Sequence, residues 1–238
     1  MSVHLLAIAA HRDDVELTCA GTLLKAIDQG HRTGILDLSA GESGTHGSAK
    51  LRGDEAERAA KILGVAERRN AGLPDAHLQN SEEARRIVVE QIRHFAPRVV
   101  ILPFPIGRHP DHRIASELGR DACFLAGLAK YDAGGEPHRP HKLLYSLAYR
   151  EDPVKPTFVV DISAQFDRKL AAIKCYSSQF DGVKNAGEIF PTGQDLYSLI
   201  ETQNAHYGSL IRTRYGEPFF TQETMRVDDV VKLEVQSL

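Results

Sequence analysis

The sequence predicts an α/β protein with a Rossmann-like, mostly parallel sheet, helices on both faces and an active site at the C-terminal edge of the strands. Strand-length apolar runs alternate with amphipathic helical patterns along the chain, which is typical of such a sheet. Polar or glycine-rich residues directly follow three of these runs, at residues 3–10, 32–39 and 98–103. Because ligands bind at the carboxyl ends of parallel strands, these three connections are expected to meet at one functional edge.

The first half of the chain contains three expected strands and three expected helices. Residues 3–10 form an apolar run, and a helical pattern follows it and stops at Gly30. The remaining expected elements are a strand at 32–39, a glycine-rich loop at 40–47, a helix at 49–63, a short strand at 66–72 and a helix at 81–95. Gly64 and Pro97 mark the ends of the two later helices.

The second half begins with a clear buried strand at 98–103, followed by a polar loop. A long helix is expected at 113–131, and Gly134 and Gly135 begin a polar connector. The later expected elements are strands at 142–148 and 157–161, a helix at 164–178, a loop or flap at 181–195, a helix at 196–212 and a short strand-like tail at the end. No repeat or linker divides the chain, so residues 1–238 are expected to form a single domain.

Composition narrows the range of functions. Hydrophobic residues make up 42% and charged residues 26% of the 238 residues, as in an ordinary globular protein. The formal net charge of −3 gives no electrostatic sign of nucleic acid or an anionic membrane as partners. The three cysteines are scattered without metal-binding spacing and read as reduced thiols. With no signal peptide or transmembrane run, a cytoplasmic location is expected.

The turn after the first strand carries His11, Asp13 and Asp14. A phosphate-binding turn would be glycine-rich, and two acids at a helix start would repel an anion. Either acid alone could simply cap the helix. An imidazole and a carboxylate at this position are also two ordinary zinc ligands, which leaves a third to be found.

The loop after residues 98–103 supplies that third ligand in the run His109-Pro110-Asp111-His112. A lone loop histidine is usually a surface residue, but two such motifs at one edge predict a metal site. His11, Asp14 and His112 would form a His₂–carboxylate set with an open position, which is the pattern of catalytic zinc.

Hydrolysis at such a site also needs a base and a group that steadies the oxyanion. Asp13 is the natural base, because it adjoins the expected ligand Asp14. His109 is the natural acid or oxyanion partner, and Asp111 could keep its ring protonated and oriented. Gly41 and its neighbouring glycines would let a polar ligand approach the backbone. Arg52 could bind a carboxylate or hydroxyls, although surface exposure is the commoner fate of a helical arginine.

These motifs resemble those of the PIG-L/LmbE-like zinc-dependent deacetylases. Ala10-His11-Arg12-Asp13-Asp14 is similar to the family's Ala-His-Pro-Asp-Asp signature, and 109–112 is similar to its second motif. The resemblance continues through 41–47, 52–56 and 215–219, so it covers nearly the whole chain. Within the family, residues 111–115, 121–128 and 130–131 most resemble the bacillithiol-pathway enzymes that deacetylate N-acetylglucosaminyl malate.

The resemblance implies one Zn²⁺ per chain on His11, Asp14 and His112, with Fe²⁺ as the alternative metal in the cell. It also implies Asp13 as the general base, His109 as a cationic oxyanion stabiliser and Arg52 as a substrate contact. A late-loop tyrosine assists some members, and Tyr197 is the expected match. The departure is Arg12 in place of proline, which adds a charge beside the site and bears on substrate preference.

The expected function is hydrolytic N-deacetylation of an N-acetylglucosamine conjugate, most of all the malate glycoside in bacillithiol biosynthesis, giving glucosaminyl malate and acetate. Arg12, Arg52 and Arg108 near the motifs favour a carboxylated aglycone. The alternatives are a conjugate resembling chitobiose or a mycothiol precursor, or a sugar- or metal-binding protein without turnover. The partner would be a small sugar conjugate rather than nucleic acid or membrane. Family relatives often form homo-oligomers.

Overall fold

The computed structural model describes residues 2–44, 48–147, 154–181 and 195–235. Its strands form one seven-stranded sheet in the order β3-β2-β1-β4-β5-β7-β6. The strands are β1 (Leu5–Ala9), β2 (Thr33–Ser39), β3 (Glu67–Leu73), β4 (Val99–Pro103), β5 (Lys142–Ser146), β6 (Phe158–Asp161) and β7 (Gly216–Phe220).

The sheet is mostly parallel, which confirms the predicted fold class. β3, β2, β1, β4 and β5 pair in parallel, and β7 runs antiparallel to both β5 and β6. β1 lies between β2 and β4, so the chain order reverses direction at β1. In doubly wound sheets the ligand crevice opens at the carboxyl ends of the strands at this switch point. The predicted site residues follow β1 and β4.

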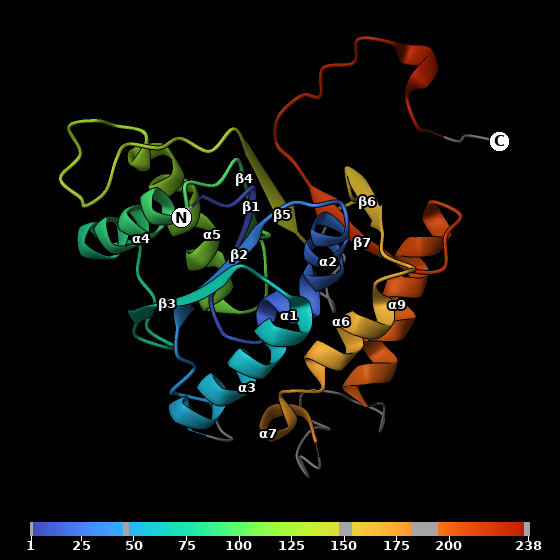
Figure 1. Cartoon of the computed structure of the whole chain (residues 1–238), viewed down its shortest axis with the longest axis horizontal. Helices are drawn as coiled ribbons and strands as arrows, with labels where there is room; N and C mark the ends of the chain where they lie inside the picture. The colour runs from blue at the N-terminus through green and yellow to red at the C-terminus, as the bar shows by residue number, and fades with distance from the viewer. Residues whose placement is uncertain (1, 45–47, 148–153, 182–194, 236–238) are drawn as a thin grey trace.

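Helices cover both faces of the sheet (Figure 1). They are α1 (Asp14–Thr18), α2 (Ala20–Asp28), α3 (Ala49–Leu63), α4 (Glu82–Phe95), α5 (Pro110–Ala126), α6 (Phe166–Ile173), α7 (Ser177–Phe180) and α9 (Leu196–Leu210), with the short 3₁₀ helix η1 (Val230–Lys232). Side chains of β1 alternate between the two layers: Leu6 and Ile8 pack with α4 and α5, whereas Leu5 and Ala7 pack with α2 and α3. Because both faces are buried, β1 reads as a continuous apolar run.

The helix expected directly after the first turn is broken at Cys19 into α1 and α2. The Glu217 carboxylate of β7 accepts hydrogen bonds from the backbone N–H groups of Gly21 and Thr22, at 2.9 and 2.7 Å. Lys169 of α6 pairs with the same carboxylate at 2.7 Å, and both side chains are fully buried. A distant carboxylate thus caps α2, and the local sequence gives no sign of it.

The helix expected at 113–131 instead begins at Pro110 and ends at Ala126. His109 is its N-cap, because its Nδ1 accepts a hydrogen bond from the Asp111 backbone N–H. His112 therefore lies inside the first turn of α5 rather than ahead of it. Proline is favoured at the first helical position, so Pro110 starts the helix.

Other expected elements also differ. The single helix expected at 164–178 is divided into α6 and α7. The strand expected in the tail is absent from residues 221–235, where η1 is the regular element that the structure describes. Most of the loop expected at 181–195 lies outside the described residues.

Among the helices of the described ranges, none has the length and apolar character to cross a membrane.

Candidate metal and active site

The turn after β1 presents Asp13 and Asp14 in different ways. Asp14 Oδ2 accepts a hydrogen bond from the His11 backbone N–H at 2.9 Å. Asp13 occupies the N-cap position of α1, yet its side chain makes no capping bond. Its Oδ1 lies instead 3.3 Å from Nη2 of Arg52. Helix capping therefore does not account for Asp13, whose carboxylate pairs with Arg52 one residue before the expected ligand Asp14.

A buried polar network holds this turn in place. Arg68 of β3 pairs with Glu16 at 2.6 Å and with Asp37 at 2.8 Å, and it donates to the carbonyl oxygen of Arg12. The hydroxyl of Tyr176 donates to the same carbonyl oxygen. Removing one partner of a buried ion pair commonly costs about 3–5 kcal/mol, so this network holds the turn firmly. The sequence analysis missed it, because no local motif links these residues.

The start of α5 brings His112 to the turn. Its Nε2 lies 3.1 Å from Asp14 Oδ1, and His11 Nδ1 lies 3.3 Å from Asp14 Oδ2. One donor atom from each of these three residues falls within 4.8 Å of the other two. Two imidazole nitrogens and a carboxylate oxygen are a zinc-type donor set. The structure thus brings together the three residues expected to be metal ligands.

A second group, His11, His109 and Asp111, also places its donor atoms within 4.8 Å of one another. Its members already have other partners, however. His109 Nδ1 accepts the Asp111 backbone N–H at 3.2 Å, and Asp111 Oδ2 accepts the Ala76 backbone N–H at 2.8 Å. The first group is therefore the better candidate for a metal site.

Asp111 and His109 are adjacent to the site, but their arrangement differs from the expected one. The Asp111 carboxylate lies 3.4 Å from His11 Nε2, and it is the Asp111 backbone that contacts the His109 ring. Burial, His112 and His11 lower the pKa of His109. With Nδ1 acting as an acceptor, the structure favours a neutral His109 that donates from Nε2, rather than the expected imidazolium.

Asp75 is a site residue that the sequence analysis missed. Its Oδ1 lies 3.1 Å from His11 Nε2, and its Oδ2 accepts the Ser43 backbone N–H at 2.9 Å. Asp75 therefore joins an expected metal ligand to the loop after β2. The available signal was its position two residues after β3, at the same edge of the sheet as the other clusters.

The site carries an excess of negative charge. Burial lowers the pKa of His11, but Asp14 and Asp75 outweigh it and raise that pKa to about 11. Burial raises the pKa of Asp75, but the hydrogen bond from His11 is the larger effect and brings the pKa to about 2. Carboxylates that attract a proton this strongly would also favour a divalent cation. The donor set and the charge therefore both fit a metal ion.

We expect Asp75→Asn to weaken metal binding about 10- to 100-fold, because partners that orient ligating histidines typically contribute this much. The amide keeps the shape of Asp75 but loses the negative charge facing His11 Nε2. Competition with a chromogenic chelator measures the affinity, and Asp132→Asn, in an exposed loop, is the matched control. Equal affinity in the Asp75 and Asp132 variants would remove Asp75 from the site.

Arg52 and Gly41 are in contact, though not as an open substrate pair. Arg52 Nη1 donates to the Gly41 carbonyl oxygen at 2.7 Å, and only 5% of the Arg52 surface is exposed. Gly41 has φ +71°, and a Cβ at this position would lie 2.2 Å from Arg52 Nη1. Glycine is therefore required here by its neighbour as well as by its backbone. The Arg52 guanidinium braces Asp13 and the loop after β2.

Tyr197 lies at the start of α9. Its hydroxyl donates to Asp181 at 2.7 Å, and its ring packs on the apolar cluster around α9. These contacts do not include the residues of the metal site.

Arg12, which stands where the resembling motif has proline, donates from Nη1 to the Ala49 carbonyl oxygen at 2.6 Å. Its side chain therefore connects the turn to the start of α3.

Comparison with known proteins identifies the family. The family described as GlcNAc-PI de-N-acetylase, or PIG-L, matches residues 6–123. A diacetylchitobiose deacetylase of Thermococcus kodakarensis is 32% identical over 232 residues, which cover 90% of this chain and 80% of the relative. The chain belongs to the PIG-L family. The matched region contains both motifs of the candidate metal site.

Two further proteins are similar to this chain. A probable N-acetyl-α-D-glucosaminyl L-malate deacetylase of Bacillus anthracis is 27% identical, over 74% of this chain and 81% of the relative. A conserved protein of Thermus thermophilus has a crystal structure that superposes with a TM-score of 0.84 at 37% identity, over 95% of this chain and 98% of that one. As a PIG-L deacetylase, the chain is an enzyme that hydrolyses amides, and the resemblance seen in its motifs is confirmed.

Proposed function

We propose that this PIG-L protein is a metal-dependent N-deacetylase of an N-acetylglucosamine conjugate. The observation that carries the proposal is the position of Asp13 beside the His11–Asp14–His112 group. Apart from its ion pair with Arg52, Asp13 neither caps the helix nor belongs to the ligand group, and a protein that only binds metal or sugar has no need of a further carboxylate here. Asp13 in this position supports turnover.

His11, Asp14 and His112 would hold the metal, which we propose to be zinc, with iron(II) as the alternative. When bound, such a metal polarises the acetamide carbonyl and makes water a better nucleophile near neutral pH. Asp13 would take a proton from the attacking water. Arg52, anchored by the Gly41 carbonyl oxygen, would hold the Asp13 carboxylate in place through its contact at 3.3 Å.

His109 would donate its Nε2 hydrogen to the oxygen on which negative charge develops. We therefore expect His109→Ala to lower kcat about 10²–10³-fold with a smaller change in KM, the size of one lost oxyanion-hole donor. Steady-state kinetics on metal-loaded protein provide the measurement, and His31→Ala, an exposed histidine, is the control. A change confined to KM would instead make His109 a substrate-binding residue.

A small cavity beside the metal group is a candidate site for the acetyl methyl. It adjoins Asp14 and His112, has an apolar wall that includes Ile101 and Phe104, and has a volume of about 40 Å³. A water molecule needs roughly 10–15 Å³ of such volume. The cavity therefore has room for more than one water molecule, and we propose that it receives the methyl of the acetyl group.

Two conjugates are candidate substrates. N-acetylglucosaminyl malate is supported by the sequence motifs and by the Bacillus anthracis relative, and N,N′-diacetylchitobiose by the Thermococcus relative. Arg52 and Arg12, both expected to bind malate, have partners within the protein: Arg52 contacts Asp13 and Gly41, and Arg12 contacts Ala49. This weakens the malate argument that the sequence alone suggested and makes chitobiose a real competitor.

Release of primary amine tests the proposal. The substrates are the malate glycoside, its methyl glycoside counterpart, diacetylchitobiose and an N-butyryl analogue, each with and without a chelator. We expect amine release from an acetylated conjugate, loss of release with chelator and little reaction of the butyryl compound. Metal-loaded protein that binds these conjugates without releasing amine would be a binding protein.

The kcat/KM of the malate glycoside, divided by that of its methyl glycoside counterpart, tests the malate assignment. A charge-assisted contact to the malate carboxylate contributes about 1.5–3 kcal/mol, or roughly 10- to 150-fold in kcat/KM. Equal values for the malate and methyl glycosides would refute the malate assignment.

A cytoplasmic location remains part of the proposal, and it is supported by free thiols at all three cysteines.

A further inference from the structure

The last segment that the structure describes is entirely exposed. It comprises residues 222–235, here named the arm, and Figure 1 shows it leaving the end of β7 and running away from the body of the protein. Six of its large apolar side chains have 43–90% of their surface exposed: Met225, Val227, Val230, Val231, Leu233 and Val235. So many apolar groups in one short exposed segment are typical of a surface that is covered by a partner.

The end of the arm has the pattern of a β-strand with one apolar face. Val231, Leu233 and Val235 alternate with Lys232 and Glu234. A single strand gains no backbone hydrogen bonds on its own and needs a neighbouring surface. Within residues 221–235 the structure has only the three-residue η1, so this pattern is not satisfied by the chain's own fold.

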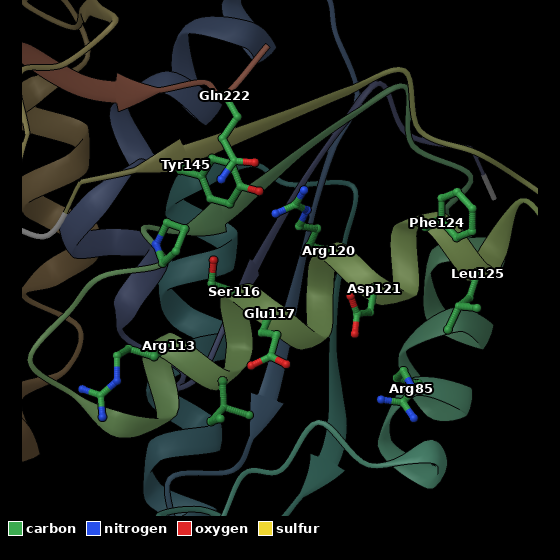
Figure 2. A pocket seen from close by; sticks show the side chains of 12 residues that line it. Arg85, Arg113, Ser116, Glu117, Arg120, Asp121, Phe124, Leu125, Tyr145 and Gln222 are labelled. Atoms are coloured by element: carbon green, nitrogen blue, oxygen red, sulfur yellow. The ribbon is translucent and has the colours of Figure 1, made fainter.

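A groove of about 890 Å³ runs along the outer side of α5, here named the α5 groove (Figure 2). Tyr145 and Gln222 lie at one end of it, with Arg120 pointing toward them, and Phe124 lies at the other end. Phe124 is 58% exposed, and the Arg139 guanidinium lies 4.4 Å from the centre of its ring. The groove is thus partly apolar, and the first residue of the arm lines it.

The groove and the arm have opposite charge. The residues that line the groove include three arginines, Arg85, Arg113 and Arg120, and only two acids. Both acids, Glu117 and Asp121, accept hydrogen bonds from the Asn80 amide, at 2.9 and 2.8 Å. The arm carries two bases and four acids: Arg226, Lys232, Glu223, Asp228, Asp229 and Glu234. A net negative, apolar segment therefore matches a net positive, partly apolar groove.

We propose that the arm lies in the α5 groove of a second copy of this chain. The arm of that second copy lies in the α5 groove of the first. The position of Gln222 supports a second copy as the occupant. Because each arm starts at the wall of its own groove, two copies that meet groove to groove place the start of each arm beside the partner's groove. Because each copy gives and receives one arm, the exchange produces a two-fold symmetric dimer with no arm or groove left over.

Light scattering coupled to size-exclusion chromatography tests the proposal on the full chain at micromolar concentration. We expect a wild-type particle of two chains. The double variant Val231→Asp/Leu233→Asp in the arm, and Phe124→Asp in the groove, should each reduce the mass to that of one chain. Leu210→Asp, which replaces a residue that is 56% exposed on α9, is the matched control and should keep the wild-type mass.

Mixing the two variants tests the exchange itself. The groove variant keeps an intact arm and the arm variant keeps an intact groove, so an equimolar mixture should regain a heterodimer visible by native mass spectrometry. A monomeric wild-type protein, or an arm variant with wild-type mass, would overturn the proposal. An arm variant that dissociates beside a groove variant that does not would overturn the α5 groove as the receptor. Circular dichroism confirms that each variant is folded.

Discussion

His112→Ala is expected to abolish deacetylation and metal binding together. His112 Nε2 lies 3.1 Å from Asp14 Oδ1 at the first turn of α5, and alanine leaves one imidazole and one carboxylate for the ion. Changing a group that hydrogen-bonds to a metal ligand typically lowers metal affinity about 10- to 100-fold. Loss of a ligand itself should therefore lower metal affinity more than ~100-fold. Elemental analysis of the purified protein and chelator competition measure the effect.

His31→Ala is a suitable control for this variant, because His31 is an exposed histidine that lies just before β2. It should keep the metal content and activity of the wild type. Full metal occupancy in His112→Ala would show that the ion lies elsewhere, and the His11–His109–Asp111 group would then be the next site to test. Loss of activity with full occupancy would make His112 a substrate contact.

Asp13→Asn should retain the metal and lose about 10²–10⁴-fold in kcat, the usual contribution of a general base. The amide occupies the same space but cannot accept a proton from the attacking water at neutral pH. Its oxygen can still accept a hydrogen bond from Arg52 Nη2, which contacts Asp13 Oδ1 at 3.3 Å in the wild type. The loop after β2 should therefore keep its position.

Metal content and kcat are measured on the same preparation, with Asp132→Asn as the exposed control. A metal-loaded Asp13→Asn enzyme with near wild-type kcat would exclude Asp13 as the base. A variant that loses metal as well would show that Asp13 supports the ligand group, so the two roles are separated by one experiment.

The fold class and most strands could be predicted because their signals are local. Apolar runs such as Leu5–Ala9 and Val99–Pro103 are buried on both faces of the sheet, and this burial requires the continuous apolar composition that the sequence displays. Helix α3 was expected at 49–63 and is observed at Ala49–Leu63, because Ser48 and Gly64 supply its caps from adjacent positions.

The elements that were missed depend on groups distant in the sequence. The break at Cys19 involves Glu217, which caps α2 from β7. The start of α5 differs from the expected residue 113, although the signal is local: Pro110 takes the first helical position. The tail was expected to be strand-like, but a strand needs a neighbour, and the structure gives residues 221–235 none within the described chain.

The sequence by itself determined the alternating α/β order and the two motifs that carry His11, Asp14 and His112, because hydrophobic periodicity and motif spacing are written in contiguous residues. Only the tertiary structure decided that Asp75 faces His11 and that Arg52 braces Asp13. It also directed the Asp111 carboxylate to His11 rather than to His109. These contacts join different strands and loops at one edge of the sheet, and their partners become neighbours only when parallel strands align their carboxyl ends.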